Sequence, residues 1–190
     1  HEHFRLARNL GYRTVWTAHN ILPHRTFLTP LDKAIRRLMM TNADAVITHC
    51  EHGRRELLAR FPRQGPIAVI PLGHYRDAYP ATMSRHDARE RLSLYPDQFA
   101  YLALGNIAAY KGLSDLVCAF KQVAGIRDVL LIAGRNRDRD VVSRLAKAAR
   151  ADDRIHFQPR FIPDEEMQVY LLAADVMVAP FKRVLTSSSV

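Results

Sequence analysis

The stretch FAYLALGNIAAYKGLSDLVCAFKQVAGIRDVLLIAG, residues 99–134, decides the fold. It opens with an apolar run over residues 99–104, continues with helical spacing of apolar residues over 112–124, and closes with a second apolar run over 129–133. Apolar runs separated by a helix predict a parallel βαβ unit, because parallel strands need a crossover connection and are covered on both faces. The stretch therefore places the chain among the α/β proteins.

The same alternation continues on both sides of this unit. Further strands are predicted at residues 12–17, 43–48, 67–71, 155–158 and 176–179. Further helices are predicted at residues 30–41, 50–61 (with Thr48 as N-cap), 86–94, 140–151 and 164–174. Residues 74–84 have no apolar period and contain Pro80, which indicates a linker. Because the pattern restarts after this linker, the sequence predicts two parallel sheets rather than one.

The composition is that of a folded globular chain. Of 190 residues, 48% are hydrophobic, which is enough for a core. No apolar run approaches the roughly 18 residues needed to span a bilayer, and no signal segment opens the chain. Cys50 and Cys118 are too few for a disulfide framework and indicate a reducing compartment. The chain begins at His1 rather than Met and stops at Val190 inside a Ser/Thr cluster, so we expect a piece of a longer protein.

Basic residues are concentrated in the first part of the chain. The sequence has 28 Lys and Arg against 19 Asp and Glu, and residues 1–79 hold 12 of the basic and 6 of the acidic residues. This balance indicates an anionic partner (a membrane surface, a phosphorylated substrate or nucleic acid) or a solvated basic surface. Nucleic acid is the least favoured, because the basic residues are scattered and no aromatic–basic repeat is present.

The residues that follow each predicted strand form the candidate site, because open parallel sheets bind ligands beyond the carboxyl ends of their strands. Many of these residues are glycine or polar, as a ligand-lined crevice requires, although ordinary turns use glycine in the same places. They are Ala18-His19-Asn20, His49, Leu72-Gly73, Gly105-Asn106, Gly134-Arg135 and the segment from Phe181.

The stretch LGNIAAYKGL, residues 104–113, resembles the opening of the donor domain in retaining glycosyltransferases of family four. Further segments match that family in the same order and cover nearly the whole chain: WTAHN at 16–20, AD at 43–44, VIPLG at 69–73, LIAG at 131–134, DRIHF at 153–157, IPDEE at 162–166 and AADVMVAP at 173–180. The resemblance implies a GT-B-like fold, in which two Rossmann-like parallel-sheet domains face each other across a cleft. Residues 1–79 would be the second half of the N-terminal acceptor domain, and residues 80–190 a linker and the first part of the C-terminal donor domain, each domain incomplete.

The resemblance also implies a set of donor-binding residues. Lys111, beside Gly112 at a predicted helix start, matches the lysine that the family uses on the diphosphate of its nucleotide-sugar donor, and a helix start favours an anion. Asn106 stands where the family usually has an arginine, so a hydrogen-bond donor replaces a cation. The implied donor-binding residues are Gly105, Asn106, Lys111, Gly134, Thr186 and Ser187.

The segment after Pro180 departs from the family. A glutamate-containing loop is common there, whereas no carboxylate follows Asp175 in this chain, which resembles branches of the family in polysaccharide assembly that lack this glutamate. Residues 186–189 are expected either to begin a helix that cradles a phosphate or to form an ordinary capped helix start. Lys182 and Arg183 are then either a replacement cation or plain surface bases.

The histidines are the candidate residues of the acceptor domain. The resemblance implies that His19 faces the cleft, contacts the donor sugar and orients the reacting groups, which makes it the candidate catalytic residue. Asn20, His24 and His49 are expected on the acceptor side. The run HCEH at 49–52 also suggests a metal site, but consecutive residues at a helix start do not share one face and no partner cluster has ligand spacing, so no metal is expected.

The helix predicted over residues 30–41 carries Lys33, Arg36 and Arg37 beside apolar residues. GT-B enzymes with lipid-linked acceptors often dock on anionic lipid through such a helix, which combines apolar area with charge. A helix that covers the sheet and turns a solvated face outward has the same pattern. The expected partners are a nucleotide-sugar donor, a saccharide or lipid-linked acceptor and an anionic membrane surface, with a cytoplasmic protein peripheral on the inner face of the membrane.

Two functions are compatible with these residues. The first is a retaining, hexosyltransferase-like enzyme that moves a sugar from a nucleotide-diphosphate sugar to an acceptor in polysaccharide or glycoconjugate assembly. It needs no metal or other cofactor, because a lysine and helix ends take the place of the metal, and this piece alone is not expected to be active. The second is a degenerate GT-B-like module that binds a nucleotide or a partner without catalysis, which Asn106 and the missing glutamate favour. A glutamate-bearing phosphate loop beyond Val190 would favour the enzyme.

Overall fold

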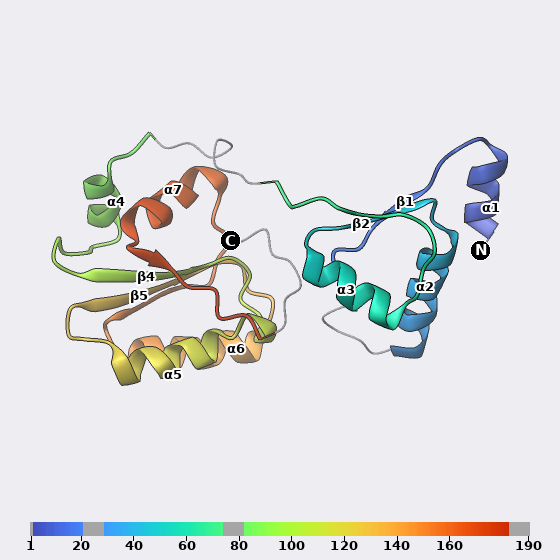
Figure 1. Cartoon of the computed structure of the whole chain (residues 1–190). Helices are drawn as coiled ribbons and strands as arrows, with labels where there is room; N and C mark the ends of the chain where they lie inside the picture. The colour runs from blue at the N-terminus through green and yellow to red at the C-terminus, as the bar shows by residue number, and fades with distance from the viewer. Residues whose placement is uncertain (1, 21–28, 74–81, 183–190) are drawn as a thin grey trace. The chain divides into compact units, whose positions relative to one another are not determined.

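The computed structural model describes residues 2–20, 29–73 and 82–182. They form two compact units, residues 2–73 and 82–182, each with its own parallel sheet (Figure 1). The α/β class and the two separate parallel sheets are therefore confirmed. The predicted domain boundary at residues 79–80 and most of the predicted linker lie outside the described residues, so the boundary stays a prediction. Among the described residues, none of the helices has the length and apolar character needed to cross a bilayer.

The first unit is a three-stranded parallel sheet with helices beside it. In chain order its elements are α1 (Glu2–Asn9), β1 (Val15–Thr17), α2 (Thr29–Asn42), β2 (Ala45–Thr48), α3 (Glu51–Arg60) and β3 (Ile67–Val69). The strand order is β1-β2-β3, and the core contains the fully buried Met40, Val46 and Leu57 from α2, β2 and α3. The apolar periodicity does not predict α1, because only Phe4 of that helix packs against the core and no residue in it is buried.

The N-cap of α3 differs from the prediction. Thr48 was the expected cap, but α3 begins at Glu51 and its N-cap is Cys50, whose Sγ accepts a hydrogen bond from the Gly53 amide at 3.3 Å. Thr48 is instead the last residue of β2 and is fully buried, and its hydroxyl has no hydrogen-bond partner among the described residues. The prediction for Thr48 was wrong because α3 begins at Glu51, one residue later than predicted, and the residue directly before it is Cys50.

Asp44 holds the amino-terminal ends of β1 and β2 together. Its Oδ2 accepts hydrogen bonds from the amide of Thr14 at 2.7 Å and from the Thr14 hydroxyl at 2.9 Å. These bonds, together with Arg8 and Arg13 nearby, hold the pKa of the Asp44 carboxyl below its usual range. The register of the two strands is thus fixed at the edge opposite the candidate site.

The second unit is a four-stranded parallel sheet between two helical layers. Its elements are α4 (Arg85–Arg91), β4 (Phe99–Leu104), the 3₁₀ turn η1 (Ala109–Lys111), α5 (Leu113–Val123), β5 (Asp128–Ala133), α6 (Arg139–Arg150), β6 (Ile155–Gln158), α7 (Asp164–Ala173) and β7 (Val176–Met177). The strand order is β6-β5-β4-β7. Helices α5 and α6 cover one face and α4 and α7 the other (Figure 1).

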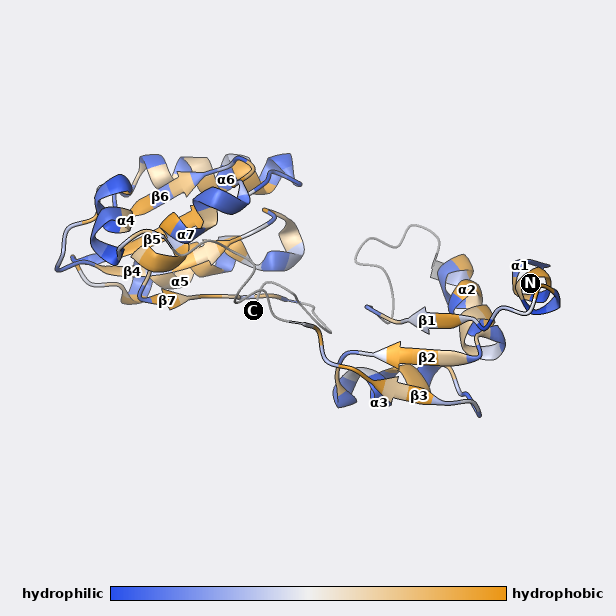
Figure 2. Ribbon diagram, turned by 90° about the horizontal axis from the view of Figure 1, so that it is seen from above, coloured by the Kyte–Doolittle hydropathy of each residue, from blue (hydrophilic) through white to orange (hydrophobic). Residues whose placement is uncertain are grey.

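Alternate side chains of β5 are buried on opposite faces of this sheet. Leu130 and Ile132 pack with α5 and α6, whereas Leu131, which lies between them, packs with α4 and α7. All three side chains are fully buried, as period-two alternation on a covered strand requires. Coloured by hydropathy, the strands are predominantly apolar, and the most hydrophilic residues lie mainly on the helices and loops (Figure 2).

Asp175 connects the beginning and the end of the second unit. Its carboxylate accepts a hydrogen bond from the amide of Ala100 at 2.7 Å and pairs with Arg85 at 2.6 Å and with Arg89 at 3.5 Å. Burial alone would raise the pKa of Asp175, but the Ala100 amide and the Arg85 guanidinium outweigh burial and hold that pKa below its usual range. The carboxylate is thus kept charged where α7 ends and β7 begins.

Arg89, the buried partner of Asp175, also links α4 to other parts of this unit. Its side chain is buried and donates hydrogen bonds to the carbonyl oxygens of Tyr95 at 2.8 Å, Gln98 at 2.6 Å and Ala173 at 2.9 Å. A guanidinium has five N–H groups in a fixed fork, so it can serve several carbonyls at once. Arg89 therefore holds α4, the turn before β4 and the end of α7 in one arrangement.

Candidate functional site

Two histidines meet at the carboxyl edge of the first sheet. His19 lies two residues beyond β1 and His49 directly follows β2, and Nε2 of His49 is 3.2 Å from Nδ1 of His19. The two rings are tilted by 45° with their centroids 4.8 Å apart. On its other side, Nδ1 of His49 is 2.8 Å from the carbonyl oxygen of Ile70, which directly follows β3. The structure thus brings together two of the predicted site residues.

Asn20 and His24 are the other residues predicted for the site in this unit. Asn20 follows His19 and is half-buried, whereas His24 lies outside the described residues. The metal reading of residues 49–52 gains no support, because Cys50 caps α3 and no group of three or more metal-ligating side chains is found among the residues that the structure describes. The absence of a metal stays a prediction.

In the second unit, the loops after β4 and β5 pack backbone against backbone. Gly105 and Gly134 both have positive φ angles, of 122° and 150°. A Cβ atom added at Gly134 would lie 1.6 Å from the carbonyl oxygen of Gly105, so only glycine fits. Beyond the glycines, the amide of Ile107 donates to the carbonyl of Arg135 at 2.9 Å and the amide of Arg137 donates to Ile107 at 3.0 Å. These two glycines therefore set the shape of the strand ends, which is a structural role in addition to the predicted one.

Lys111 is the buried cation of this edge. The residue is only 8% exposed, and burial lowers the pKa of its ammonium. Its Nζ lies 3.8 Å from the centroid of the Phe181 ring and 5.6 Å from that of Tyr110. With Asn106 and Phe181 it lines a hollow of about 10 Å³ where β4 and β7 end, room for about one water molecule. Three predicted donor-binding residues, Gly105, Asn106 and Lys111, thus line one hollow at the strand ends.

The start of α5 lies directly beside Lys111. Gly112 caps this helix in a left-handed conformation with φ of 68°, and a Cβ atom there would lie 2.0 Å from the carbonyl oxygen of Pro180. Lys182 pairs through Nζ with Asp115, the acidic residue of the first turn of α5, at 2.8 Å. Lys182 is therefore part of a salt bridge, and it offsets a carboxylate that would otherwise repel an anion at the helix start. Arg183, Thr186 and Ser187 lie outside the described residues.

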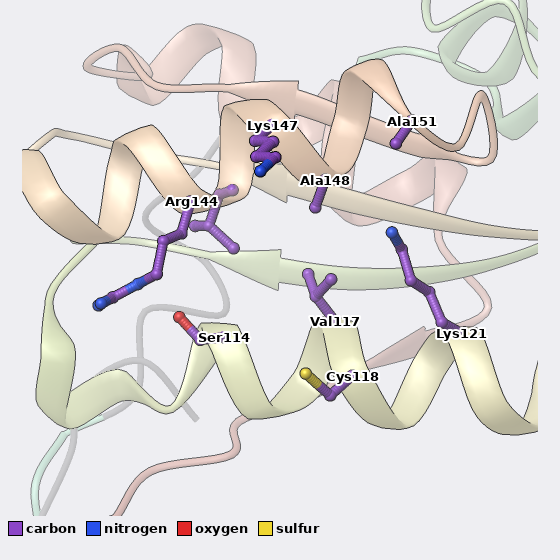
Figure 3. Close-up of a pocket in the computed structure, with 9 residues that line it drawn as sticks. Ser114, Val117, Cys118, Lys121, Arg144, Lys147, Ala148 and Ala151 are labelled. Atoms are coloured by element: carbon purple, nitrogen blue, oxygen red, sulfur yellow. The ribbon is translucent and has the colours of Figure 1, made fainter.

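A larger cavity lies elsewhere on the second unit, between α5 and α6 (Figure 3). It has a volume of about 340 Å³, an apolar floor that includes Val117 and Leu145, and a basic rim of Lys121, Arg144 and Lys147. It lies on the helical layer rather than at the carboxyl ends of the strands. None of the residues implied by the family resemblance lines it, so we assign the candidate site to the hollow at Lys111.

Sequence reasoning missed the contacts that join these residues. Phe181 is the first residue after Pro180 in the sequence, but nothing in its surroundings predicts that its ring lies under Lys111. The hydrogen bond between His19 and His49 was also missed, although His19 lies two residues beyond β1 and His49 directly follows the neighbouring strand β2. If the register between β1 and β2 were known, it would predict that His19 lies beside His49. The Phe181 contact depends on the path of the chain after β7, which no sequence pattern gives.

Two family models match this chain. Residues 84–183 match the family described as glycosyl transferases group 1, and residues 1–75 match the family described as glycosyltransferase family 4. No curated protein matches the sequence significantly.

Several solved structures share the fold. Sucrose-phosphate synthase from Thermosynechococcus elongatus matches 97% of this chain with a TM-score of 0.78 and 24% identity. HepE of Anabaena, solved in complex with UDP, matches 95% with a TM-score of 0.77 and 13% identity. WaaG, a glycosyltransferase involved in lipopolysaccharide biosynthesis, matches 90% with a TM-score of 0.70 and 16% identity. This chain covers 48%, 50% and 50% of those chains, so it spans about half of their length.

The match to the group 1 family covers more than half of the 190 residues, and the structural neighbours are GT-B glycosyltransferases. Both findings agree with the family that the sequence motifs indicate. The chain therefore belongs to the glycosyl transferases group 1 family.

Proposed function

We propose that the full-length protein is a glycosyltransferase that moves a sugar from a nucleotide-diphosphate sugar to an acceptor hydroxyl. The observation that carries the proposal is Lys111, a buried cation at the carboxyl ends of β4 and β7, inside the part of the chain that matches the group 1 family. HepE, which has a similar fold, is solved with UDP and with UDP-glucose, and this supports a nucleotide sugar as donor.

The chemistry of transfer needs positive charge at this position. The bond between the anomeric carbon and the diphosphate oxygen breaks, and its electron pair leaves with the nucleoside diphosphate. The acceptor oxygen bonds to the anomeric carbon, and its proton passes to the departing diphosphate or to water. Lys111 and the amide groups at the start of α5 would stabilise the charge that develops on the diphosphate, without a divalent metal ion. Retention of configuration is the expectation that comes with the family resemblance.

A nucleotide titration tests the donor site. Calorimetry on the full-length protein would compare UDP, GDP and ADP without added metal. We expect one of them to bind, and Lys111→Ala to weaken that binding by more than about tenfold, roughly 1.4 kcal/mol. The matched control is Lys121→Ala, which removes a lysine from the cavity between α5 and α6 and should leave the affinity unchanged. If the folded protein binds none of the three nucleotides, the donor site is wrong.

A second candidate function is a GT-B-like module that binds a nucleotide without transferring a sugar. Asn106 in place of a cation, and the lack of a carboxylate among residues 176–190, favour this candidate. Both functions predict nucleotide binding that depends on Lys111. A transfer assay with the matching nucleotide sugar separates them, and NMR of the new linkage would then report retention or inversion.

We further propose that the acceptor is lipid-linked and that α2 contacts an anionic membrane. Leu31 and Ile35, four residues apart, are 53% and 38% exposed, and the exposed Lys33 and Arg37 lie on the same helix. Exposed apolar residues beside cations are the combination that binds anionic lipid. The alternative is a solvated helix that binds no lipid.

Vesicle flotation tests this membrane proposal. The full-length protein should float with vesicles that contain anionic lipid and remain behind with neutral ones, and the double variant Leu31→Gln, Ile35→Gln should lose most of the bound fraction. Leu10→Gln, which changes a 64% exposed leucine after α1, is the matched control. Equal flotation of all three proteins would contradict a role for α2.

A further inference from the structure

The residues His19, His49 and Ile70 lie in one row across the first sheet. Thr17 pairs with Ile47 and Thr48 pairs with Val69 in the parallel registers of the three strands. Counting outward from these pairs places His19 beside His49 and His49 beside Ile70. The row lies just beyond the carboxyl ends of the strands, and the two short contacts run along it.

The hydrogen bonds in this row determine where the hydrogen atoms lie. The carbonyl oxygen of Ile70 can only accept, so Nδ1 of His49, 2.8 Å away, carries a hydrogen. A neutral imidazole has one N–H group, so Nε2 of His49 is an acceptor. Nδ1 of His19, 3.2 Å from that acceptor, must therefore be the donor.

We infer that His49 is a positioning residue that holds His19 in the tautomer with its hydrogen on Nδ1. In that tautomer Nε2 of His19 has a lone pair and can accept a hydrogen bond. Which nitrogen of a histidine is protonated is commonly set by the partner of the other nitrogen. Here the partner is a second histidine, whose own tautomer is set by a backbone carbonyl that cannot titrate.

The consequence for the reaction rests on the proposed function. In the transferase, Nε2 of His19 is the acceptor for a hydroxyl group of the sugar or of the acceptor substrate. In the other tautomer Nε2 of His19 would be a hydrogen-bond donor, and the substrate hydroxyl would have to accept instead of donate. His49 thus acts through His19 and need not touch the substrate.

The tautomers can be measured without substrate. In the full-length protein labelled with ¹⁵N-histidine, a long-range proton–nitrogen spectrum distinguishes the two tautomers of each ring, and His19→Asn identifies the signals of His19 by their loss. We expect the hydrogen on Nδ1 in both His19 and His49. A hydrogen on Nε2 of His19 in the wild type would overturn the inference.

Two variants of His49 separate positioning from packing. In His49→Gln the amide oxygen can occupy the place of Nε2 and accept from His19, whereas in His49→Asn the side chain is too short for this but can still donate to Ile70. We expect His19 to keep its Nδ1 hydrogen in the Gln variant and to lose that preference in the Asn variant. The same His19 tautomer in both would show that His49 only packs against it.

Kinetics then connect the tautomer to the reaction. We expect His49→Asn to lower kcat by at least about tenfold with little change in KM, because a catalytic histidine with an incorrect tautomer loses turnover rather than binding. His49→Gln should recover most of kcat. If the spectra agree with the inference and the wild type transfers no sugar, the proposed function fails and the tautomer assignment stands. If sugar is transferred and both variants are as fast as the wild type, the role of His49 is wrong.

Discussion

The ammonium nitrogen of Lys111 lies 3.8 Å from the centroid of the Phe181 ring. Burial lowers the pKa of this lysine, whereas the negative face of an aromatic ring favours the charged form. Among the residues that the structure describes, no carboxylate forms a salt bridge with Lys111. The Phe181 ring therefore offsets part of the cost of burying a charge at a place where the proposed ligand is an anion.

Replacing Phe181 tests this relationship. Phe181→Leu should lower the pKa of Lys111 further, because the ring face that favours the ammonium is lost. A cation–π contact of about 0.5–1 kcal/mol corresponds to nucleotide binding that is about two- to fivefold weaker at pH values well above the pKa of Lys111. Calorimetry over a pH series measures this, and Phe181→Tyr, which keeps the ring, should resemble the wild type. Identical pH curves for the Leu variant and the wild type would contradict the contact.

The protonation of Lys111 should be visible in the pH dependence of nucleotide binding. As the pH rises through the lowered pKa of Lys111, the ammonium becomes a neutral amine and the attraction to diphosphate is lost, so affinity should fall at a lower pH than for an ordinary lysine. Lys111→Arg stays charged throughout, so its affinity should be level from neutral pH to about pH 10. A parallel decline in both proteins would assign the titration to another group.

Gly134 should be intolerant of even the smallest side chain. In Gly134→Ala the new methyl group would meet the carbonyl oxygen of Gly105 at 1.6 Å, with φ at 150°, so we expect a loss of at least about 2 kcal/mol in the free energy of unfolding. Gly125→Ala is the control, because its methyl group would lie 3.6 Å from Asp128, an ordinary contact. Urea denaturation of the full-length protein compares the two, and similar midpoints would show that the loops can separate.

Arg85 and Arg89 pair with the same carboxylate but should differ in importance. Arg89→Met removes the buried donor to three carbonyl oxygens, and we expect a loss of about 3–5 kcal/mol in the free energy of unfolding. Arg85 has a side chain that is 49% exposed, so Arg85→Met should cost about 1 kcal/mol or less. Thermal unfolding of both variants measures the difference. Arg85 also donates to the carbonyl oxygen of Ala174 at 2.9 Å, so equal losses would mean that the burial of Arg89 adds nothing to stability.

The elements of the fold could be predicted because their signals are local. Residues 99–104 and 155–158 are strands with the bounds that the apolar runs predict. The other strands and α2–α7 lie within a few residues of their predictions, since period and turn residues mark them. Helix α1 has no such signal because none of its residues is buried.

The contacts within the candidate site could not be predicted in the same way. Lys111 and Gly112 were found from a motif, but the Phe181 ring comes from 70 positions further along the chain, and only the ends of β4 and β7 bring it near. The pair of His19 and His49 depends on the register between β1 and β2. Neither composition nor periodicity contains that register. The sequence pattern therefore locates the ends of the strands but does not predict which side chains form hydrogen bonds there.

The hydrogen bonds of Asp175 also bear on the order in which the chain acquires its structure. Synthesis proceeds from the amino end, so Arg85, Arg89 and the amide of Ala100 leave the ribosome before Asp175 does. Until then β4 lacks its link to the start of β7, and the guanidinium of Arg89 lacks both the carboxylate and the carbonyl of Ala173. The second unit consequently cannot be complete before residues 175–177, which supply this carboxylate and β7, have left the ribosome.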